Sequence, residues 1–227
     1  MNNFIKITNL SKKYEKNKAI KVLKDLTFNF VSGKSYSIMG PSGSGKSTLL
    51  NMLSLIDTPT TGSILINNKK INTNNNAEND IIRASKIGII YQDKNLLSDF
   101  TALENVYLPN LLISKEKQKS KELAKKLIKK VGMITRLNHF PNELSGGENQ
   151  RIAIARALIN DPEIILADEP TGNLDTNNAK LIFKILFNLK NKNRIIIFAT
   201  HNRYFANMAD CKITMNNGNI KVTNGSI

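Results

Sequence analysis

The sequence is poor in cysteine and in long apolar runs, and each absence excludes a class of protein. Its 227 residues include one cysteine, Cys211, which excludes an intrachain disulfide and favours a reducing compartment such as the cytosol. The longest apolar runs, such as KIGIIY, EIILAD and RIIIFAT, fall far short of the roughly 20 residues that span a bilayer. The start, MNNFIKITNL, lacks the charged and apolar regions of a signal peptide. We therefore expect one domain that is soluble by itself.

Acidic residues are also scarce, with 18 Asp and Glu against 33 Lys and Arg, which leaves a formal net charge of +15. A nucleic acid or an anionic membrane as partner is one explanation. The other is a compositional bias of the genome, which the Lys- and Asn-rich stretch NNKKINTNNNAEND indicates. We favour the second explanation, because net charge concerns solubility and partners and does not determine a fold.

Hydrophobic patterning predicts an α/β fold. Short runs with strand character lie at 4–8, 26–30, 35–39, 63–68, 86–92, 163–169 and 194–201. The stretch from about 93 to 160 has helical periodicity instead, and another helical run at 177–190 separates the last two strands. Alternation of strands and helices predicts a mainly parallel core sheet with a helical insertion.

One predicted helix, at 114–132, is strongly basic. Its apolar residues Leu123, Leu127, Ile128 and Val131 are expected on one face, with lysines around the rest. Contact with anionic lipid headgroups is one interpretation of this helix. An amphipathic surface helix with a solvated face has the same pattern, and we favour that interpretation.

The segment GPSGSGKST at 40–48 follows a predicted strand and precedes a helical run, the context that supports a phosphate-binding loop. Its glycines, Gly40, Gly43 and Gly45, allow backbone amides to close around phosphate oxygens at a helix N-terminus. Lys46 supplies a positive charge for the β and γ phosphates, and Ser47 offers a hydroxyl to Mg²⁺. The motif in this context therefore favours a phosphate-binding loop over a simple glycine-rich turn before a helix.

The run IILADE at 164–169 predicts a buried strand that ends in two carboxylates. Ligands of open α/β sheets bind at the C-terminal ends of the strands. Successive strand residues point to opposite faces, so the two acids are expected to have different roles. Asp168 suits the Mg²⁺ shell, and Glu169 suits polarisation of an attacking water.

Three further side chains are weaker candidates by themselves. Gln92 follows a strand, and its amide can bind a metal or a water. His201 ends the run RIIIFATH and can donate to a γ-phosphate oxygen, whereas His139 is expected to be structural. Tyr14 is able to stack on adenine, although composition alone favours packing against the sheet.

A second glycine-rich corner occurs in LSGGENQRIAIARAL at 144–158. Ser145 and Glu148 form an S-x-x-E capping box, which accounts for both residues as helix chemistry. Gly146 and Gly147 are not explained this way, because glycine inside a first helical turn costs roughly 1 kcal/mol. Paired glycines at this place indicate a close approach of the backbone to another group.

Taken together, these motifs resemble the ATP-binding-cassette (ABC) ATPases. GPSGSGKST resembles their Walker A motif, Gln92 their Q-loop, LSGGE their signature, IILADE their Walker B, NLD at 173–175 their D-loop and His201 their switch histidine. The order matches the family and covers nearly the whole chain. The resemblance implies a P-loop NTPase fold with a RecA-like core and an antiparallel β subdomain at about 1–92 and 161–227, and a helical subdomain at about 93–160.

The resemblance also implies a head-to-tail homodimer, with each ATP between Walker A of one copy and the signature of the other. Its catalytic residues would be Lys46, Glu169 and His201, Asp175 would connect the two sites, and Mg²⁺ would be held by Ser47, Gln92 and Asp168. The residues expected to bind ATP within one chain are Tyr14, Gly40, Pro41, Ser42, Gly43, Ser44, Gly45, Lys46, Ser47, Thr48 and Gln92. Those expected to contact the ATP of the other copy are Leu144, Ser145, Gly146, Gly147 and Glu148.

At finer level, 99–106, 138–148 and 166–175 resemble the LolD group, the ATPases of lipoprotein-releasing transporters, within a broader group that includes MacB-type exporters. This implies permease partners of LolC and LolE type and a peripheral place on the cytoplasmic face of the inner membrane. An FtsE-type cell-division ATPase stays open as an alternative. A nucleic-acid-handling cassette is disfavoured, because only 99 residues separate Lys46 from Ser145 (145 − 46). Asn149 and Asn202 depart from the residues usual in the family.

Overall fold

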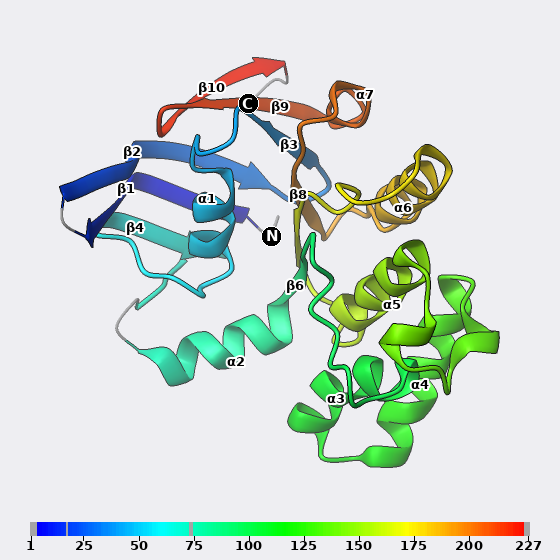
Figure 1. Cartoon of the computed structure of the whole chain (residues 1–227). Helices are drawn as coiled ribbons and strands as arrows, with labels where there is room; N and C mark the ends of the chain where they lie inside the picture. The colour runs from blue at the N-terminus through cyan, green and yellow to red at the C-terminus, as the bar shows by residue number, and fades with distance from the viewer. Residues whose placement is uncertain (1–3, 17, 73–74, 225–227) are drawn as a thin grey trace.

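The main sheet of the computed structural model has six strands in the order β10-β9-β3-β8-β7-β6 (Figure 1). The structure describes residues 4–16, 18–72 and 75–224. The strands of this sheet are β3 (Ser35–Met39), β6 (Ile87–Ile90), β7 (Ile164–Asp168), β8 (Ile195–Ala199), β9 (Cys211–Asn216) and β10 (Asn219–Asn224). Neighbours are parallel except in the β9–β10 hairpin. The prediction of a mainly parallel core sheet is confirmed.

A second, antiparallel sheet has the order β2-β1-β4-β5. Its strands are β1 (Phe4–Lys16), β2 (Lys18–Val31), β4 (Thr61–Ile66) and β5 (Lys69–Lys70). Ile5 pairs with Phe30 on one side and with Ile66 on the other. Buried Ile5 and Ile7 alternate with exposed Lys6, as a half-buried strand requires. The β1–β2 hairpin extends well beyond the strands predicted at 4–8 and 26–30.

Seven α-helices are described: α1 (Lys46–Leu53), α2 (Asn76–Lys86), α3 (Ala102–Ser114), α4 (Lys117–Lys130), α5 (Gly146–Leu158), α6 (Thr176–Asn188) and α7 (Arg203–Ala206). Two short 3₁₀ segments, η1 (Ile134–Arg136) and η2 (Pro141–Glu143), precede α5. Within the described part of the chain, no helix is long and apolar enough to cross a membrane.

The main sheet separates two hydrophobic cores. Alternate residues of one strand enter different cores: Ile164 and Leu166 of β7 pack with α1 and the antiparallel sheet, whereas Ile165 and Ala167 pack with helices α3 to α6. Strand β8 follows the same alternation, with Ile197 on the first face and Phe198 on the second. Because both faces are covered, these strands are continuous apolar runs. The sheet thus holds the carboxyl end of β7 rigidly.

The basic helix differs in detail from its prediction. In α4, the buried positions are Ser120, Ala124 and Ile128, a spacing of four that places them on one face. Leu123 was predicted on the apolar face, but this was wrong, since it is 36% exposed. The small Ser120 and Ala124 lie between α4 and its neighbours because α3 packs closely against this helix.

Sequence patterning missed α2, α7 and the strands β5, β9 and β10. Helix α2 begins in an asparagine-rich stretch, and its N-cap is Asn75, whose side chain accepts a hydrogen bond from the Glu78 amide. Asparagine is a favoured N-cap but also a common loop residue, so this signal is ambiguous in the sequence. The β9–β10 hairpin is closed by Asn217 and Gly218, both at positive φ, which is a hairpin signature.

Candidate nucleotide-binding site

The phosphate-binding loop predicted at 40–48 connects the end of β3 to the start of α1. Gly45 is the N-cap of α1 in a left-handed conformation, with φ of 104°, and no side chain caps the helix. The first amides of α1 are therefore free to bind an anion. The Lys46 ammonium donates to the carbonyls of Gly40 at 2.8 Å and Pro41 at 3.1 Å. Since an ammonium has three donors, one is left for a phosphate oxygen.

Gly40 is required by packing within the chain as well as by the loop itself. A Cβ added there would lie 2.2 Å from the carbonyl oxygen of Met215 in β9, a distance that backbone atoms do not tolerate. The sequence gives no sign of this contact, because Met215 is far away along the chain. The first glycine of the motif thus lets the loop pack against the neighbouring strand.

A cavity of about 610 Å³ lies over the loop. It is lined by Gly40, Pro41, Ser42, Gly43, Gly45, Lys46, Ser47 and Thr48, and by Val22, Gln92, Asp168, Glu169 and His201. The fold therefore brings together side chains that were predicted separately, from the ends of β6, β7 and β8. Ser44 is buried and does not line the cavity. Val22, an apolar residue of β2, was not predicted, because a single valine in a strand has no distinguishing signal.

Asp168 and Ser47 face each other inside this cavity. Burial raises the pKa of the Asp168 carboxyl above its ordinary value, while the Ser47 hydroxyl opposes that rise and the neighbouring Glu169 carboxylate adds to it. Lys46 also lowers the pKa, but not enough to reverse the effect of burial. A half-buried carboxylate whose charged form is disfavoured provides a good place for a cation.

Glu169 directly follows β7 and has a backbone φ of 45°, in the left-handed region that non-glycine residues seldom adopt. The Glu169 amide donates to the Ala199 carbonyl at 3.1 Å, which anchors this turn to β8. Its carboxylate Oε2 lies 3.0 Å from His201 Nδ1 and accepts a hydrogen bond from the His201 amide at 3.3 Å. The carboxylate is thereby held toward the cavity, and strain of this kind is typical of functional residues.

Gln92 reaches the same cavity from the segment after β6. Its side chain packs against Gly172, where an added Cβ would be 2.9 Å from Nε2. The glycine of the PTGNLD segment therefore makes room for the glutamine. Gln92 and the loop after β7 are in contact, so a movement of either one would displace the other.

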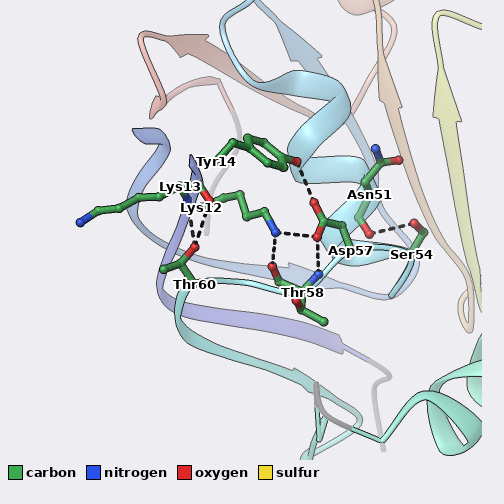
Figure 2. Close-up of polar contacts among 8 residues, drawn as sticks. All are labelled: Lys12, Lys13, Tyr14, Asn51, Ser54, Asp57, Thr58 and Thr60. Carbon is green, nitrogen blue, oxygen red and sulfur yellow. Dashed lines mark hydrogen bonds and ion pairs between the residues drawn. The ribbon is translucent and has the colours of Figure 1, made fainter. Parts of the chain in front are cut away.

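Tyr14 lies beside the cavity without lining it. Composition alone favours packing of its ring against the sheet, but the residue is 40% exposed. Its hydroxyl donates to Asp57 Oδ2 at 2.7 Å (Figure 2). Burial and the interaction with Asp57 raise the pKa of Tyr14, and Thr48 of the phosphate loop opposes the shift, so the phenol is close to that loop.

The signature segment has the predicted capping box. Ser145 is the N-cap of α5, its hydroxyl accepts from the Glu148 amide at 3.3 Å, and Glu148 Oε2 accepts from the Ser145 amide at 2.9 Å. Glu148 Oε1 also accepts from Arg136 Nε at 3.0 Å. The Ser145 amide and then Arg136 lower the pKa of Glu148 from 4.5 to about 2.

The two glycines of the signature have different surroundings. A Cβ on Gly147 would lie 2.5 Å from the side-chain oxygen of Asn178, whereas one on Gly146 would meet only Leu174 at 3.5 Å. Asn178 is itself tied to Asp175, which caps α6 by accepting from the amides of Asn177 and Asn178. The close approach expected from the glycines exists at Gly147, and the group approached belongs to the same chain.

None of the residues 144–148 lines the cavity over the phosphate loop. Ser145, Gly146 and Glu148 instead lie near the surface, at the exposed start of α5. The fold of one chain therefore keeps the signature segment apart from the cavity over the phosphate loop.

Asn149 and Asn202, which depart from the residues usual in the family, both form hydrogen bonds with backbone groups. Asn149 donates its side-chain amide to the carbonyls of Pro141 and Leu144, at 2.8 and 3.1 Å, which holds the turn before the signature. Asn202 caps α7 by accepting from the amides of Tyr204 and Phe205. Asparagine and aspartate are equivalent N-caps, so this substitution preserves the local structure.

Comparisons with known proteins find relatives that match nearly the whole chain. The family model described as ABC transporter matches residues 23–172. The lipoprotein-releasing system ATP-binding protein LolD of Rickettsia bellii is 42% identical over 98% of this chain and 99% of its own length. An uncharacterised ABC transporter ATP-binding protein of Methanocaldococcus jannaschii, MJ1508, is 43% identical over 95% of this chain and 97% of its own.

A solved structure with a similar fold is the cassette MJ0796, described as a dimer in a post-hydrolysis state bound to ADP and Pi. It superposes with a TM-score of 0.91 and 37% identity, covering 98% of this chain and 99% of that one.

Proposed function

The chain belongs to the ABC transporter family of ATPases, and from this premise we propose that it drives the release of lipoproteins from the inner membrane. Two copies would bind a pair of permease subunits of LolC and LolE type on the cytoplasmic face. The similarity to LolD of Rickettsia bellii over almost the full length of both chains supports this choice over MacB-type export and FtsE-type cell division. It also disfavours a nucleic-acid-handling ATPase.

One observation carries the catalytic part of the proposal: a single cavity joins the phosphate loop, Glu169 and His201. In this arrangement, the α1 amides and Lys46 bind the phosphates of ATP. Glu169 accepts a hydrogen bond from the attacking water and orients it toward the γ phosphorus. His201 keeps the Glu169 carboxylate in place, and His201 is 71% exposed, so its other ring nitrogen can donate to a γ-phosphate oxygen.

The residues predicted for Mg²⁺ fit that ion. Ser47, Asp168 and Gln92 all line the cavity and offer hydroxyl, carboxylate and amide oxygens. Two or three such side chains leave the remaining positions around the ion to phosphate oxygens and water. When bound, Mg²⁺ neutralises phosphate charge. Its charge would also offset the unfavourable desolvation of the Asp168 carboxylate.

We place the second anion corner in the active site of the partner copy. Ser145 and Gly147 do not line the cavity of their own chain, and Ser145 and Gly146 at the start of α5 are exposed. A head-to-tail dimer would bring each signature to the γ-phosphate bound by Lys46 of the other copy. The dimer described for MJ0796, which has nearly the same fold, supports this arrangement.

Purification of the protein from detergent-solubilised membranes tests the proposal. We expect two transmembrane subunits with periplasmic domains to co-purify with it. When reconstituted in proteoliposomes, this complex should release lipoprotein to an acceptor after ATP is added, and the Glu169→Gln complex serves as the inactive control. An ATP-hydrolysing complex that releases no lipoprotein would contradict the proposed cargo, and a cell-division membrane protein as the sole partner would contradict the permease assignment.

A further inference from the structure

A compact polar network connects the Tyr14 ring to the loop that follows α1 (Figure 2). Asp57 is its centre. The Tyr14 hydroxyl donates to Asp57 Oδ2 at 2.7 Å, and the Lys12 ammonium donates to Asp57 Oδ1 at 2.6 Å. The Thr58 amide donates to the same Oδ1 at 2.7 Å, and the Thr58 carbonyl accepts from Lys12 at 2.7 Å. Each carboxylate oxygen of Asp57 thus has a partner.

The loop that carries Asp57 is fixed at both ends. The Asp57 amide donates to the Asn51 carbonyl in the last turns of α1 at 3.2 Å. Farther along, the Thr60 amide donates to the Ser11 carbonyl of β1 at 2.9 Å, and the Thr60 hydroxyl accepts from the Lys13 amide at 2.9 Å. Helix α1 begins at the phosphate loop, so Asp57 ties the strand that carries Tyr14 to the element that binds phosphate.

The network also determines which side of the ring is open. Lys12 lies 4.9 Å from the centroid of the Tyr14 ring and covers one face. The residue is nevertheless 40% exposed. A flat base can therefore stack only on the face opposite Lys12. The bond to Asp57 holds the far end of the ring, and rotation of the ring away from that orientation would break it.

The ion pair of Lys12 and Asp57 is largely buried, which favours a role in fixing the geometry of its neighbours. The side chains of Lys12 and Asp57 are only 11% and 25% exposed. Desolvation offsets much of the attraction between buried charges, so such a pair is a poor source of stability, although it can specify one arrangement of its neighbours. The neighbour that this pair holds is the Tyr14 ring.

From these contacts, we infer that Asp57 is a positioning residue for adenine, which orients the Tyr14 ring relative to the phosphate loop. The inference rests on the proposed function and on the expectation that Tyr14 stacks on the base of ATP. It adds that the residue recognising the base and the loop recognising the phosphates are connected through Asp57. Loss of Asp57 should weaken recognition of the base and leave recognition of the phosphates intact.

Calorimetric binding of two ligands, ATP and inorganic tripolyphosphate, tests this separation. For both Asp57→Asn and Tyr14→Phe, we expect the Kd for ATP to rise about five- to tenfold. This rise corresponds to the lower end of the free energy of stacking one base on an aromatic side chain. The Kd for tripolyphosphate should stay within about twofold of wild type, since these variants keep the phosphate loop. In hydrolysis assays, KM for ATP should rise while kcat at saturation is retained. The double variant should be no weaker than either single one, because both changes remove the same charge-assisted hydrogen bond.

Asp25→Asn is the matched control. Asp25 is an aspartate of the adjacent strand β2 that also accepts from a lysine and a hydroxyl, Lys21 and Ser11, and has no contact with Tyr14. Its ATP affinity should equal that of wild type. Equal losses for ATP and tripolyphosphate in Asp57→Asn would show a merely structural role and overturn the inference, as would unchanged affinity for ATP. Wild-type protein that binds no ATP would instead contradict the proposed function.

Discussion

Glu169 has two features at the residue scale that set it apart from the other acids of the sheet. It adopts a strained φ of 45°, and its carboxylate is held by both the ring and the amide of His201. Asp168 lies beside Ser47 of the phosphate loop and Glu169 beside His201, and both line one cavity, so that the two acids serve different roles stays a prediction.

Glu169→Gln should slow ATP hydrolysis by about 10²-fold or more, since the amide cannot accept a proton from water. Binding of ATP should be retained, because the phosphate contacts come from α1 and Lys46. Phosphate release measures the first effect and calorimetry the second. Glu163→Gln is a suitable control, as Glu163 precedes the opposite end of the same strand, β7. Turnover near the wild-type rate in Glu169→Gln would refute the role of this residue.

At the scale of elements, the N-terminus of α5 packs against the N-terminal turn of α6. Gly147 packs against Asn178, and Asn178 bonds to Asp175 at the N-terminus of α6. The signature and the D-loop are therefore in contact within one chain. Communication between the sites through Asp175 remains a prediction, and this contact supplies a physical route for it.

Substitution of the two signature glycines should have opposite effects on stability. Gly147→Ala is expected to lower the free energy of unfolding by about 1–3 kcal/mol, as overpacking does, because its Cβ would displace Asn178. Gly146→Ala has space, and alanine is the better helix former, so stability should be unchanged or raised by up to about 1 kcal/mol. Urea titrations of the two variants measure the difference. Equal stability of both variants would contradict the packing explanation.

The capping box makes stability depend on pH. The pKa of Glu148 falls from 4.5 to about 2 on folding, so its contribution is present above pH 4.5 and lost as the pH falls toward 2. Between these values, the unfolded chain binds more protons than the native one. Glu148→Gln should therefore reduce the decline of unfolding free energy in this interval, measured by urea denaturation at several pH values. Glu122→Gln on α4 provides the same change of charge as a control. An identical decline in wild type and Glu148→Gln would refute this linkage.

At the scale of the whole molecule, the main feature is the separation of the two glycine-rich corners, the phosphate loop and the signature, in one chain. The cavity over the phosphate loop contains the catalytic candidates, while the signature lies at the exposed start of α5, in the helical part of the molecule (Figure 1). A head-to-tail pair of chains uses both corners and makes two equal sites. Neither site would be complete in a single chain.

Mixing of two inactive variants tests this sharing. Lys46→Ala removes a phosphate contact in one chain, and Ser145→Arg blocks the signature of the other. Each variant alone should be inactive, since every site in its dimers contains a damaged part. An equal mixture should recover up to about a quarter of wild-type turnover, because half of randomly formed dimers are mixed and each has one intact site. Full activity of Ser145→Arg alone would contradict sharing between chains.

The sequence by itself determined the motifs and most of the elements that carry them. GPSGSGKST, IILADE and the LSGGE capping box depend on local chemistry, namely loop conformation, strand burial and helix capping, and these are readable from neighbouring residues. The parallel sheet followed from short, continuously apolar strands that alternate with helices.

Only the tertiary structure decided how distant residues meet. The contacts of Gly40 with Met215, Gly147 with Asn178 and Tyr14 with Asp57 join segments far apart in the chain. The hairpin β9–β10 and the helix α2 were not predicted, since short elements in asparagine-rich stretches have weak local preferences. Periodicity specifies which face of an element is apolar, but packing selects its neighbour. For that reason, Leu123 was expected inside and lies outside.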